Sequence, residues 1–388
     1  MDNTEYYERS LQLHALNKGK IGTALKIPVR VYDDLAAVYF PGVEEPCMLI
    51  KQDKENARLY SIKANTVAVV TDGSKVSCLG NIGGLAALPA AEGKALLLKQ
   101  FGDVDAFPIC VDTQDADKIV ETVKNITPGF GGIMLESIAA PKCFEIERKL
   151  KEMLDVPVFN DGSYGTAVVV CAAVINAFKL AGKPLSDVRA VIAGAGAAGN
   201  AIVKMLSLIG VRDMVVLDSK GILNPTRMSE FGEDKLGLLE MTNKDGISGG
   251  LEKGVRNRDF FVGAAKPGIL TEELVKTMRK SPVILALSKP EPEIEPGLAK
   301  ASGAGVVGTG LSCFPNLLDN ALVFPGVMRG AIDAEAKDIT EKMLVAAAYA
   351  LAGLVSDSEL AEDYVLPGLF KENVTETIAK AVTEAWKN

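Results

Sequence analysis

The sequence has very little histidine and few aromatic residues. Histidine occurs once in 388 residues, as His14 in a polar segment near the N-terminus, and aromatic side chains make up 6%. An enzyme that relies on histidine to move a proton would have only this residue. We expect His14 to be a surface residue, so any acid or base in this chain must be another side chain.

The chain also lacks a Cys-x-x-Cys motif. Its six cysteines are far apart, and most lie inside apolar runs, so we expect reduced thiols in the core. They are Cys47, Cys78, Cys110, Cys143, Cys171 and Cys313.

Long hydrophobic runs and clusters of basic residues are absent as well. The longest apolar run, at 167–174, is too short to cross a bilayer, and the first ten residues have no apolar stretch. The net charge of -8 and the pI near 5.1 argue against nucleic acid and against an anionic membrane surface as partners. We therefore expect a cytoplasmic protein.

What the sequence does contain is typical of an α/β enzyme. A length of 388 residues with 48% hydrophobic residues suits two domains. Short apolar runs alternate with helical patterns in both halves, which favours parallel sheets. We predict an N-terminal α/β substrate domain over residues 1–162, and a Rossmann-type, doubly wound parallel sheet with C-terminal helices over 163–388.

A glycine-rich turn between a predicted strand and a predicted helix is the strongest motif. It lies within residues 188–221 and reads G-A-G-A-A-G. Gly194 allows a tight turn, Gly196 lets backbone N–H groups approach a pyrophosphate, and Gly199 lets the helix pack closely on the strand. The N-terminus of the helix adds partial positive charge near the phosphates. FAD and S-adenosylmethionine sites use related turns and remain alternatives.

An acidic residue follows at the position expected for ribose recognition. Asp218 ends the next predicted strand, about 20 residues after Gly199, where a carboxylate binds a ribose 2′-OH and repels a 2′-phosphate. NAD is therefore favoured, although Lys220 offers a charge for NADP. The small-residue loop that contains Ala264 suits a nicotinamide ribose. The expected cofactor contacts are Gly194, Gly196, Ala197, Ala198, Gly199, Asp218, Ser219, Lys220 and Ala264.

Several polar residues of the N-terminal half are candidates for chemistry. Lys94 lies in an apolar helical run, where partial burial would lower its pKa and make it a base, although a surface lysine is the plainer interpretation. Glu136 and Asp161 follow two predicted strands and would point into the crevice of a parallel sheet, although either is equally compatible with a cap or a turn. Tyr39, before Pro41-Gly42, is either a packed anchor or a phenol directed into a cleft.

A series of short motifs in matching order resembles the bacterial-type malic enzymes. The motifs lie at residues 39–43 (YFPGV), 71–73, 80–83, 92–95 (EGKA), 130–133, 143–148 (CFEIER), 165–167, 194–199 and 324–326. The resemblance implies oxidation of malate with NAD or NADP and decarboxylation to pyruvate and CO2, usually in a homodimer.

The resemblance also assigns roles to individual residues. Tyr39 matches the tyrosine that protonates the enolpyruvate intermediate, and Lys94 matches the general base that takes the hydroxyl proton of malate. Asp161 matches the acid beside that lysine, and Asn320 matches an asparagine that holds the substrate carboxylate. The resemblance therefore favours a catalytic role for Lys94 over the interpretation of Lys94 as a surface lysine.

The family's Mg²⁺ or Mn²⁺ site is altered in this sequence. Ser137 and Gly162 stand where the resemblance implies two carboxylate ligands, which leaves Glu136 and Asp161 as candidates for a weak site. Lys289 stands where a substrate-binding asparagine is implied. One hypothesis is that its ammonium group takes over part of the cation's task. The alternatives are a metal-independent relative acting on another 2-hydroxy or 2-oxo acid, and a non-catalytic dinucleotide-binding regulatory protein.

Overall fold

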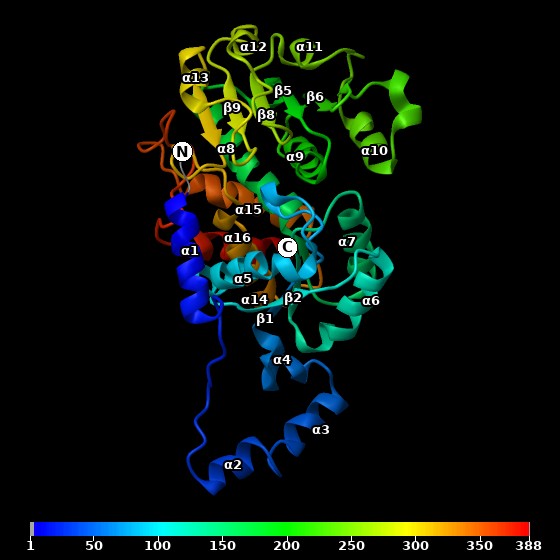
Figure 1. Cartoon of the computed structure of the whole chain (residues 1–388), viewed down its shortest axis with the longest axis vertical. Coiled ribbons are helices and arrows are strands. Elements are labelled where there is room, and N and C mark those ends of the chain that lie inside the picture. The colour runs from blue at the N-terminus through cyan, green and yellow to red at the C-terminus, as the bar shows by residue number, and fades with distance from the viewer. Residues whose placement is uncertain (1–3, 388) are drawn as a thin grey trace.

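The computed structural model describes residues 4–387 and contains two sheets that follow one another along the long axis of the molecule (Figure 1). The first sheet is parallel, with the strand order β2-β1-β3-β4. Its strands are β1 (Thr66–Thr71), β2 (Asp105–Cys110), β3 (Gly132–Leu135) and β4 (Val158–Asn160). Helices separate these strands along the chain, as the alternation of short apolar runs and helical patterns predicts.

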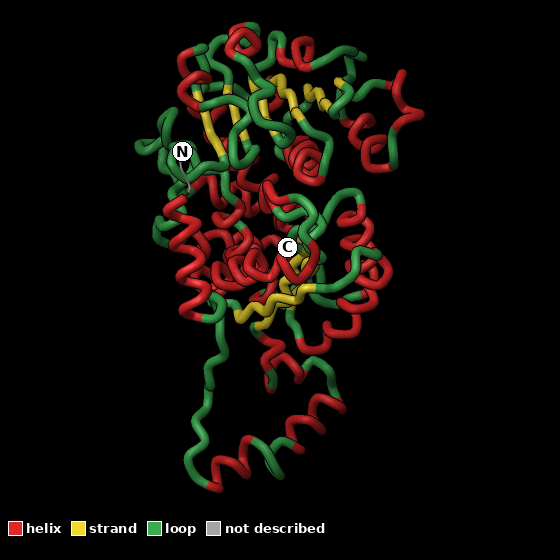
Figure 2. Tube along the Cα trace, in the orientation of Figure 1, coloured by secondary structure: helices red, strands yellow, loops and turns green. Residues whose placement is uncertain are grey.

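Both faces of the first sheet are covered, which is why its strands read as continuous apolar runs. Side chains of β1 alternate between the two faces: Val67 and Val69 pack with α5 (Gly83–Gly102). Ala68 and Val70 pack with the opposite layer, which consists of α6 (Ala116–Ile126) and α7 (Lys142–Met153). Figure 2 shows these helices around the strands.

The second sheet has the order β10-β9-β8-β5-β6-β7 and is parallel except for β7, which runs antiparallel to β6. The glycine-rich turn follows β5, which lies between β6 and β8, so it sits where the strand order reverses and ligands bind. The predicted α/β fold with a Rossmann-type sheet is confirmed, and the antiparallel β7 is its one departure from the predicted parallel sheet. The strands are β5 (Arg189–Ala193), β6 (Asp213–Asp218), β7 (Gly221–Ile222), β8 (Phe260–Gly263), β9 (Val283–Ala286) and β10 (Val306–Thr309).

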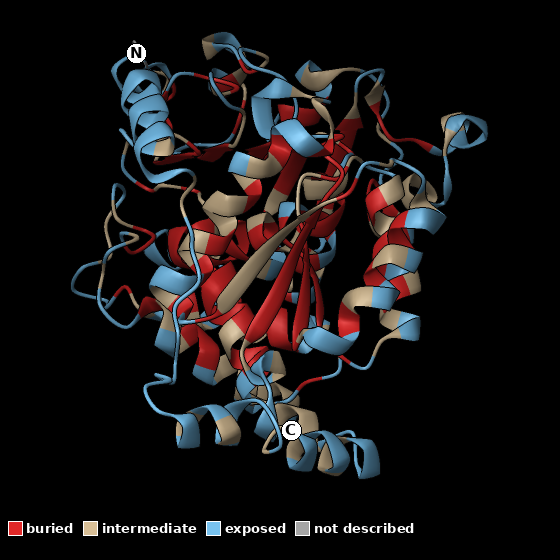
Figure 3. Ribbon diagram, turned by 60° about the horizontal axis from the view of Figure 1, so that its bottom comes forward, coloured by how far each residue is buried: buried red, intermediate tan, exposed pale blue. Residues whose placement is uncertain are grey.

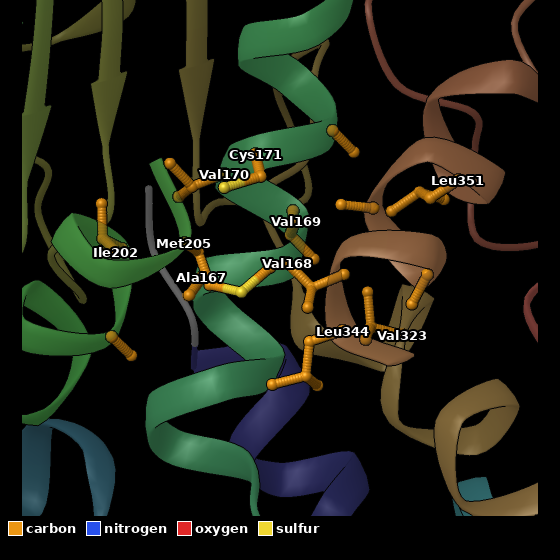
Figure 4. Close-up of a cluster of buried hydrophobic side chains, with 14 of the residues drawn as sticks. Ala167, Val168, Val169, Val170, Cys171, Ile202, Met205, Val323, Leu344 and Leu351 are labelled. Carbon is orange, nitrogen blue, oxygen red and sulfur yellow. The ribbon is translucent and has the colours of Figure 1, made fainter. Parts of the chain in front are cut away.

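The helix α8 (Thr166–Leu180) joins the two sheets and forms the centre of the core. Figure 4 shows its Val168–Cys171 region between α9 (Ala197–Leu208) and α15 (Glu341–Gly353). Within residues 4–387, the stretch 161–180 is long and apolar enough to span a membrane, with hydropathy 1.5, but 72% of it is buried in the protein. The apolar run at 167–174 lies inside this longer helix, and the burial of the helix is that of a core element. A buried core helix passes the same test.

The C-terminal helices return to the first sheet. α14 (Phe324–Asp333) and α16 (Val374–Lys387) pack on each other and on α5. A Cβ on Gly330 would come within 2.4 Å of the Ala379 carbonyl oxygen, so this helix contact requires glycine. The division of the chain at residues 162 and 163 stays a prediction.

Residues 4–60 form four helices with no buried residue, and the last three of these helices project from the core in Figure 1. The four helices are α1 (Thr4–Asn17), α2 (Tyr32–Val38), α3 (Glu44–Gln52) and α4 (Asn56–Tyr60). Figure 3 shows this region as exposed. We call residues 32–62 the N-terminal arm. The remaining α-helices are α10 (Glu233–Met241), α11 (Leu251–Val255), α12 (Glu272–Lys276) and α13 (Pro296–Ala301).

All six cysteines are unpaired thiols, as expected, but most are not in the core. Only Cys143 and Cys171 are buried, whereas Cys47, Cys78 and Cys313 are exposed. The prediction of core thiols is wrong for these three because apolar neighbours in sequence do not guarantee burial for helices of the arm and for surface loops.

Candidate active site

Two predicted carboxylates meet at the C-terminal edge of the first sheet. Glu136 directly follows β3, and Asp161 follows β4 in a π-helical turn (Asp161–Gly165). Because neighbouring parallel strands end at the same edge, their following residues are brought together. The Asp161 carboxylate is fully buried, so it needs a positively charged or hydrogen-bonding partner.

Lys94 of α5 supplies that partner. Its Nζ donates to Asp161 Oδ2 at 2.6 Å and to Asn320 Oδ1 at 3.3 Å, and it lies 3.7 Å from Glu136 Oε2. The ammonium group also lies 4.5 Å from the centre of the Phe324 ring. Asn320 Nδ2 donates to the same Asp161 oxygen. Three residues predicted to act together, Lys94, Asp161 and Asn320, are thus in direct contact.

The charges of this cluster determine the protonation of the lysine. Burial by itself lowers the pKa of Lys94, but the carboxylates of Asp161 and Glu136 outweigh burial and raise it above the ordinary value. Burial raises the pKa of Asp161 to about 6, against the opposing effect of Lys94. From the apolar residues beside Lys94 in the sequence, we expected burial to lower its pKa. This expectation is wrong, because the pKa is raised. Without substrate, Lys94 is an ammonium group at neutral pH.

Tyr39 does not join this cluster within one chain. It directly follows α2, which lies at the far end of the N-terminal arm in Figure 1, well away from α5. Its side chain is 67% exposed. The role that the resemblance implies for Tyr39 requires its phenol to face the same cleft as Lys94, and this expectation is wrong for the chain as it is folded here.

The residues around Lys94 do not fit a divalent metal ion. Glu136 and Asp161 both face the Lys94 ammonium, and the Ser137 hydroxyl donates to Glu136 Oε1 at 2.9 Å. Gly162 has no side chain to offer. Across residues 4–387 no cluster of three or more histidine, cysteine, aspartate or glutamate side chains could hold a metal. Hard divalent cations prefer several oxygen ligands, whereas here a cation already belongs to the protein.

A second lysine approaches from the other sheet. Lys289 lies in the loop after β9, and its Nζ is 3.3 Å from Asp319 Oδ2. Asp319 precedes Asn320, so this ion pair adjoins the Lys94 cluster. Burial raises the pKa of Asp319, but Lys289 and a backbone hydrogen bond hold it below the ordinary value. Asp319 was not predicted, although its place beside Asn320 is a signal in the sequence.

The glycine-rich turn lines a cleft of about 670 Å³. Gly194 has φ of +120°, and a Cβ there would lie 2.4 Å from the Ala264 carbonyl oxygen. A Cβ on Gly199 would lie 1.8 Å from the Gly194 oxygen, whereas one on Gly196 would meet no protein atom. The first and third glycines therefore close the turn, and the second leaves open backbone, which fits a dinucleotide pyrophosphate.

Most predicted cofactor residues lie at this cleft. Gly194, Gly196, Asp218, Ser219 and Lys220 line it. Ala197, Ala198 and Gly199 form the first turn of α9 behind it. Ala264 was expected to contact the cofactor, but its carbonyl packs against Gly194 of the turn. The next two residues of that loop, Ala265 and Lys266, line the cleft instead.

Asp218 is held by two cations that were not predicted. Arg227 Nη2 donates to both of its carboxylate oxygens at 3.0 Å, and Lys235 Nζ donates to Oδ2 at 2.8 Å. Lys220, the predicted phosphate-binding residue, is instead paired with Glu230 at 2.9 Å. Although burial raises the pKa of Asp218, these cations lower it overall, so the carboxylate is ionised at neutral pH.

A buried glutamate connects the two sites. Glu293 accepts hydrogen bonds from Ala265 N at 3.1 Å and from Ser288 N and Oγ at 3.0 and 2.6 Å. It thereby ties the cofactor loop to the loop that carries Lys289. A dinucleotide cleft adjoining a lysine–carboxylate cluster defines an NAD-binding oxidoreductase in which a lysine is placed to move the proton.

Comparison with known proteins identifies the family. The malic enzyme N-terminal domain model matches residues 18–151, and the malic enzyme NAD binding domain model matches residues 164–386. The bifunctional malic/malolactic enzyme of Bacillus subtilis is 49% identical over 378 residues, 97% of this chain and 92% of that protein. The NAD-dependent malic enzyme of Geobacillus stearothermophilus is 47% identical, over 95% of this chain and 76% of that protein. The NAD-dependent malic enzyme of Thermotoga maritima has a crystal structure with a TM-score of 0.93 and 44% identity, covering 96% and 98% of the two chains. This chain belongs to the malic enzyme family.

Proposed function

We propose that this protein is an NAD-dependent oxidoreductase that converts malate to pyruvate and CO2. The observation that carries the proposal is the contact of Lys94 with Asp161 and Asn320 beside a dinucleotide cleft. Lys94 takes the hydroxyl proton of the substrate, Asn320 holds a substrate carboxylate, and Asp161 positions and tunes the lysine. NAD, when bound, accepts the hydride from C2.

The raised pKa of Lys94 has a consequence for this role. A base must be unprotonated when the substrate hydroxyl loses its proton, yet Lys94 is an ammonium group between two carboxylates. The proton therefore has to leave before the reaction. We infer that kcat/KM rises with pH through neutrality.

The experiment that tests the function is an assay of NADH formation with a panel of 2-hydroxy acids, with and without Mn²⁺. We expect turnover of malate with release of CO2. Turnover of another 2-hydroxy acid in place of malate would support the relative with altered substrate. Absence of turnover with every acid, despite NAD binding, would leave a non-catalytic dinucleotide-binding protein.

We further infer that the reaction proceeds without a divalent metal ion. Lys289 lies next to the Lys94 cluster and carries a positive charge that can hold the 2-oxygen and stabilise charge developing on an enolate. The donor set around Glu136 and Asp161 does not fit a metal ion. In place of a bound cation, the protein has two lysines, Lys94 and Lys289, among three carboxylates, those of Glu136, Asp161 and Asp319.

We infer that Asp218 makes NAD the preferred cofactor. We further infer that Arg227 and Lys235, which pair with Asp218, determine the size of the preference for NAD over NADP. Replacing Asp218 by asparagine removes the repulsion of a 2′-phosphate and frees Arg227 and Lys235 to bind it. We expect the ratio of kcat/KM for NADP over NAD to rise by about tenfold or more, since about 1.4 kcal/mol corresponds to tenfold. The measurement is steady-state kinetics with both cofactors.

The matched control for this prediction is Asp245→Asn, which changes the same charge at an exposed position on the same domain. An unchanged ratio in Asp218→Asn would contradict the role of Asp218. A raised ratio that persists when Arg227 is also replaced by alanine would place the phosphate on Lys235.

We also propose a cytoplasmic homodimer whose partner molecules are small carboxylic acids, with no nucleic acid or membrane partner. Six unpaired cysteines suit a reducing compartment, and the net charge of -8 suits an enzyme that does not bind anionic polymers. The N-terminal arm, whose helices contain no buried residue, suits a dimer.

A further inference from the structure

The N-terminal arm leaves the protein at the edge of the first sheet opposite to the Lys94 cluster. Its last residue leads into a 3₁₀ turn (Ile62–Ala64) that runs directly into the start of β1, and Lys26, just before the arm, pairs with Asp105, the first residue of β2. Glu136 and Asp161 follow the ends of β3 and β4. Because the strands are parallel and β1 has 6 residues, the two edges are separated by about 20 Å.

The arm makes an ion pair with the protein at this same edge. Lys54 Nζ lies 2.7 Å from Asp155 Oδ2, just before the start of β4. Tyr39 directly follows α2, which lies farther from the sheet than α4 does in Figure 1. Tyr39 of one chain therefore cannot contact Lys94 of the same chain while the arm keeps this position.

The surface of the arm is apolar and uncovered. Tyr39 and Phe40 are 67% and 65% exposed. Further exposed apolar side chains on the arm are Tyr32, Leu35, Val38, Met48, Leu59, Tyr60 and Ile62. Exposed apolar surface of this extent is typical of a protein interface.

A second exposed apolar surface lies at the receiving edge. Leu79 and Leu85 flank the glycine loop that precedes and begins α5, and Leu85 is 86% exposed. A Cβ on Gly73, which follows β1, would lie 2.1 Å from the Gly83 oxygen, so this loop packs on the C-terminal edge of the sheet. The apolar loop and the Lys94 cluster thus lie at the same edge.

The groups that the structure places on Lys94 are two carboxylates, an amide and a phenyl ring. In the described part of the chain, none of these contacts is a phenol that can donate a proton. The role of Tyr39 as the proton donor to the enolate rests on the proposed function. For that role, the phenol has to lie beside the Lys94 cluster.

We propose that a second copy of this chain completes each active site: the arm of one protomer packs on the C-terminal edge of its partner's first sheet and brings Tyr39 to the partner's Lys94 cluster. A two-fold axis makes the exchange reciprocal, so each dimer has two sites that are each built from both chains. The exposed apolar residues of the arm and the Leu79–Leu85 loop become buried together.

Active-site complementation tests this arrangement. Lys94→Ala and Tyr39→Phe chains with different tags are coexpressed, and the mixed dimer is purified by both tags. In shared sites, one of the two sites combines an intact Lys94 with an intact Tyr39, so the mixed dimer regains about half of the wild-type activity. Both homodimers of single variants stay low. If each site used residues of one chain, no site in the mixed dimer would be intact, and activity at the level of the homodimers would overturn the proposal.

A second measurement does not depend on turnover. Benzoylphenylalanine in place of Tyr39 is irradiated in the full-length protein, and the linked peptides are mapped. We expect a covalent dimer linked to the partner's residues 79–94 or 136–137. Links within one chain, or no link to this edge, would overturn the proposal. The interchain link without malate turnover in the wild type would refute the proposed function and leave the shared site standing.

Discussion

Replacement of Lys94 by alanine is expected to lower kcat by about 10²–10⁴-fold, the range for loss of a general base. Lys94 is the group that contacts Asp161, Glu136 and Asn320 together, which is the basis for its proposed role as the base. The measurement is steady-state NADH formation with saturating malate and NAD. Since the lysine acts on the reacting hydroxyl and not on the dinucleotide, NADH binding followed by fluorescence is expected to stay the same.

The control for this prediction has to separate lost chemistry from lost structure. Removing Lys94 leaves the fully buried Asp161 carboxylate without its cation, which destabilises a folded protein. The double variant Lys94→Met/Asp161→Asn keeps the volume and removes the unpaired charge, and we expect it to be folded and inactive. Lys99→Ala, on the same helix but with its ammonium on surface carboxylates, is expected to keep full activity.

The pH dependence gives a further check on the same residue. The carboxylates raise the pKa of Lys94, so the unprotonated base is lost as pH falls, and kcat/KM of the wild type should increase with pH across neutrality. In Lys94→Ala this increase should disappear. A flat wild-type profile would contradict the assignment of Lys94 as the base.

Removal of divalent metal ions is expected to leave activity within about twofold, whereas Lys289→Ala is expected to lower kcat by about 10²–10³-fold, as loss of a charge-stabilising donor does. The reason is that the carboxylates that would bind a metal ion face Lys94, and Lys289 is the nearby positive charge that remains for the substrate oxygen. The measurement compares turnover after exhaustive dialysis against EDTA with turnover after addition of Mn²⁺.

The matched control is Lys276→Ala, an exposed lysine on the same domain that pairs only loosely with Glu272 at 3.9 Å. It should behave as the wild type in every condition. Loss of activity in EDTA with full recovery in Mn²⁺ would show that a metal ion carries this part of the reaction. A Lys289→Ala protein that Mn²⁺ restores would lead to the same conclusion.

Much of the site follows from short patterns in the chain. The spacing of Gly194, Gly196 and Gly199 predicts the dinucleotide turn. Gly194 needs a positive φ and Gly199 packs closely on the turn, and both requirements come from residues near in sequence. Glu136 and Asp161 follow predicted strands, and parallel pairing alone brings them to one edge. The roles of Lys94 and Asn320 came from the family resemblance, not from the residues alone.

The errors concern properties that depend on distant parts of the chain. Lys94 and Asn320 are 226 residues apart in sequence, and the sign of the Lys94 pKa shift depends on which charges surround it. The same holds for Arg227 and Lys235 around Asp218. No local pattern near Tyr39 indicates that its arm leaves from the opposite edge of the sheet.

By itself, the sequence determined the α/β class, the NAD-binding turn and the family, because each of these depends on residue identity and local spacing. It also shows Ser137 and Gly162 where the resemblance implies carboxylates. Only the tertiary structure decided that two carboxylates surround Lys94 and raise its pKa, that Asp319 pairs with Lys289, and that Tyr39 lies on an arm remote from both within one chain. Electrostatic energy and distance are properties of how separate segments are placed in space, and that placement results from the burial of both sheets together.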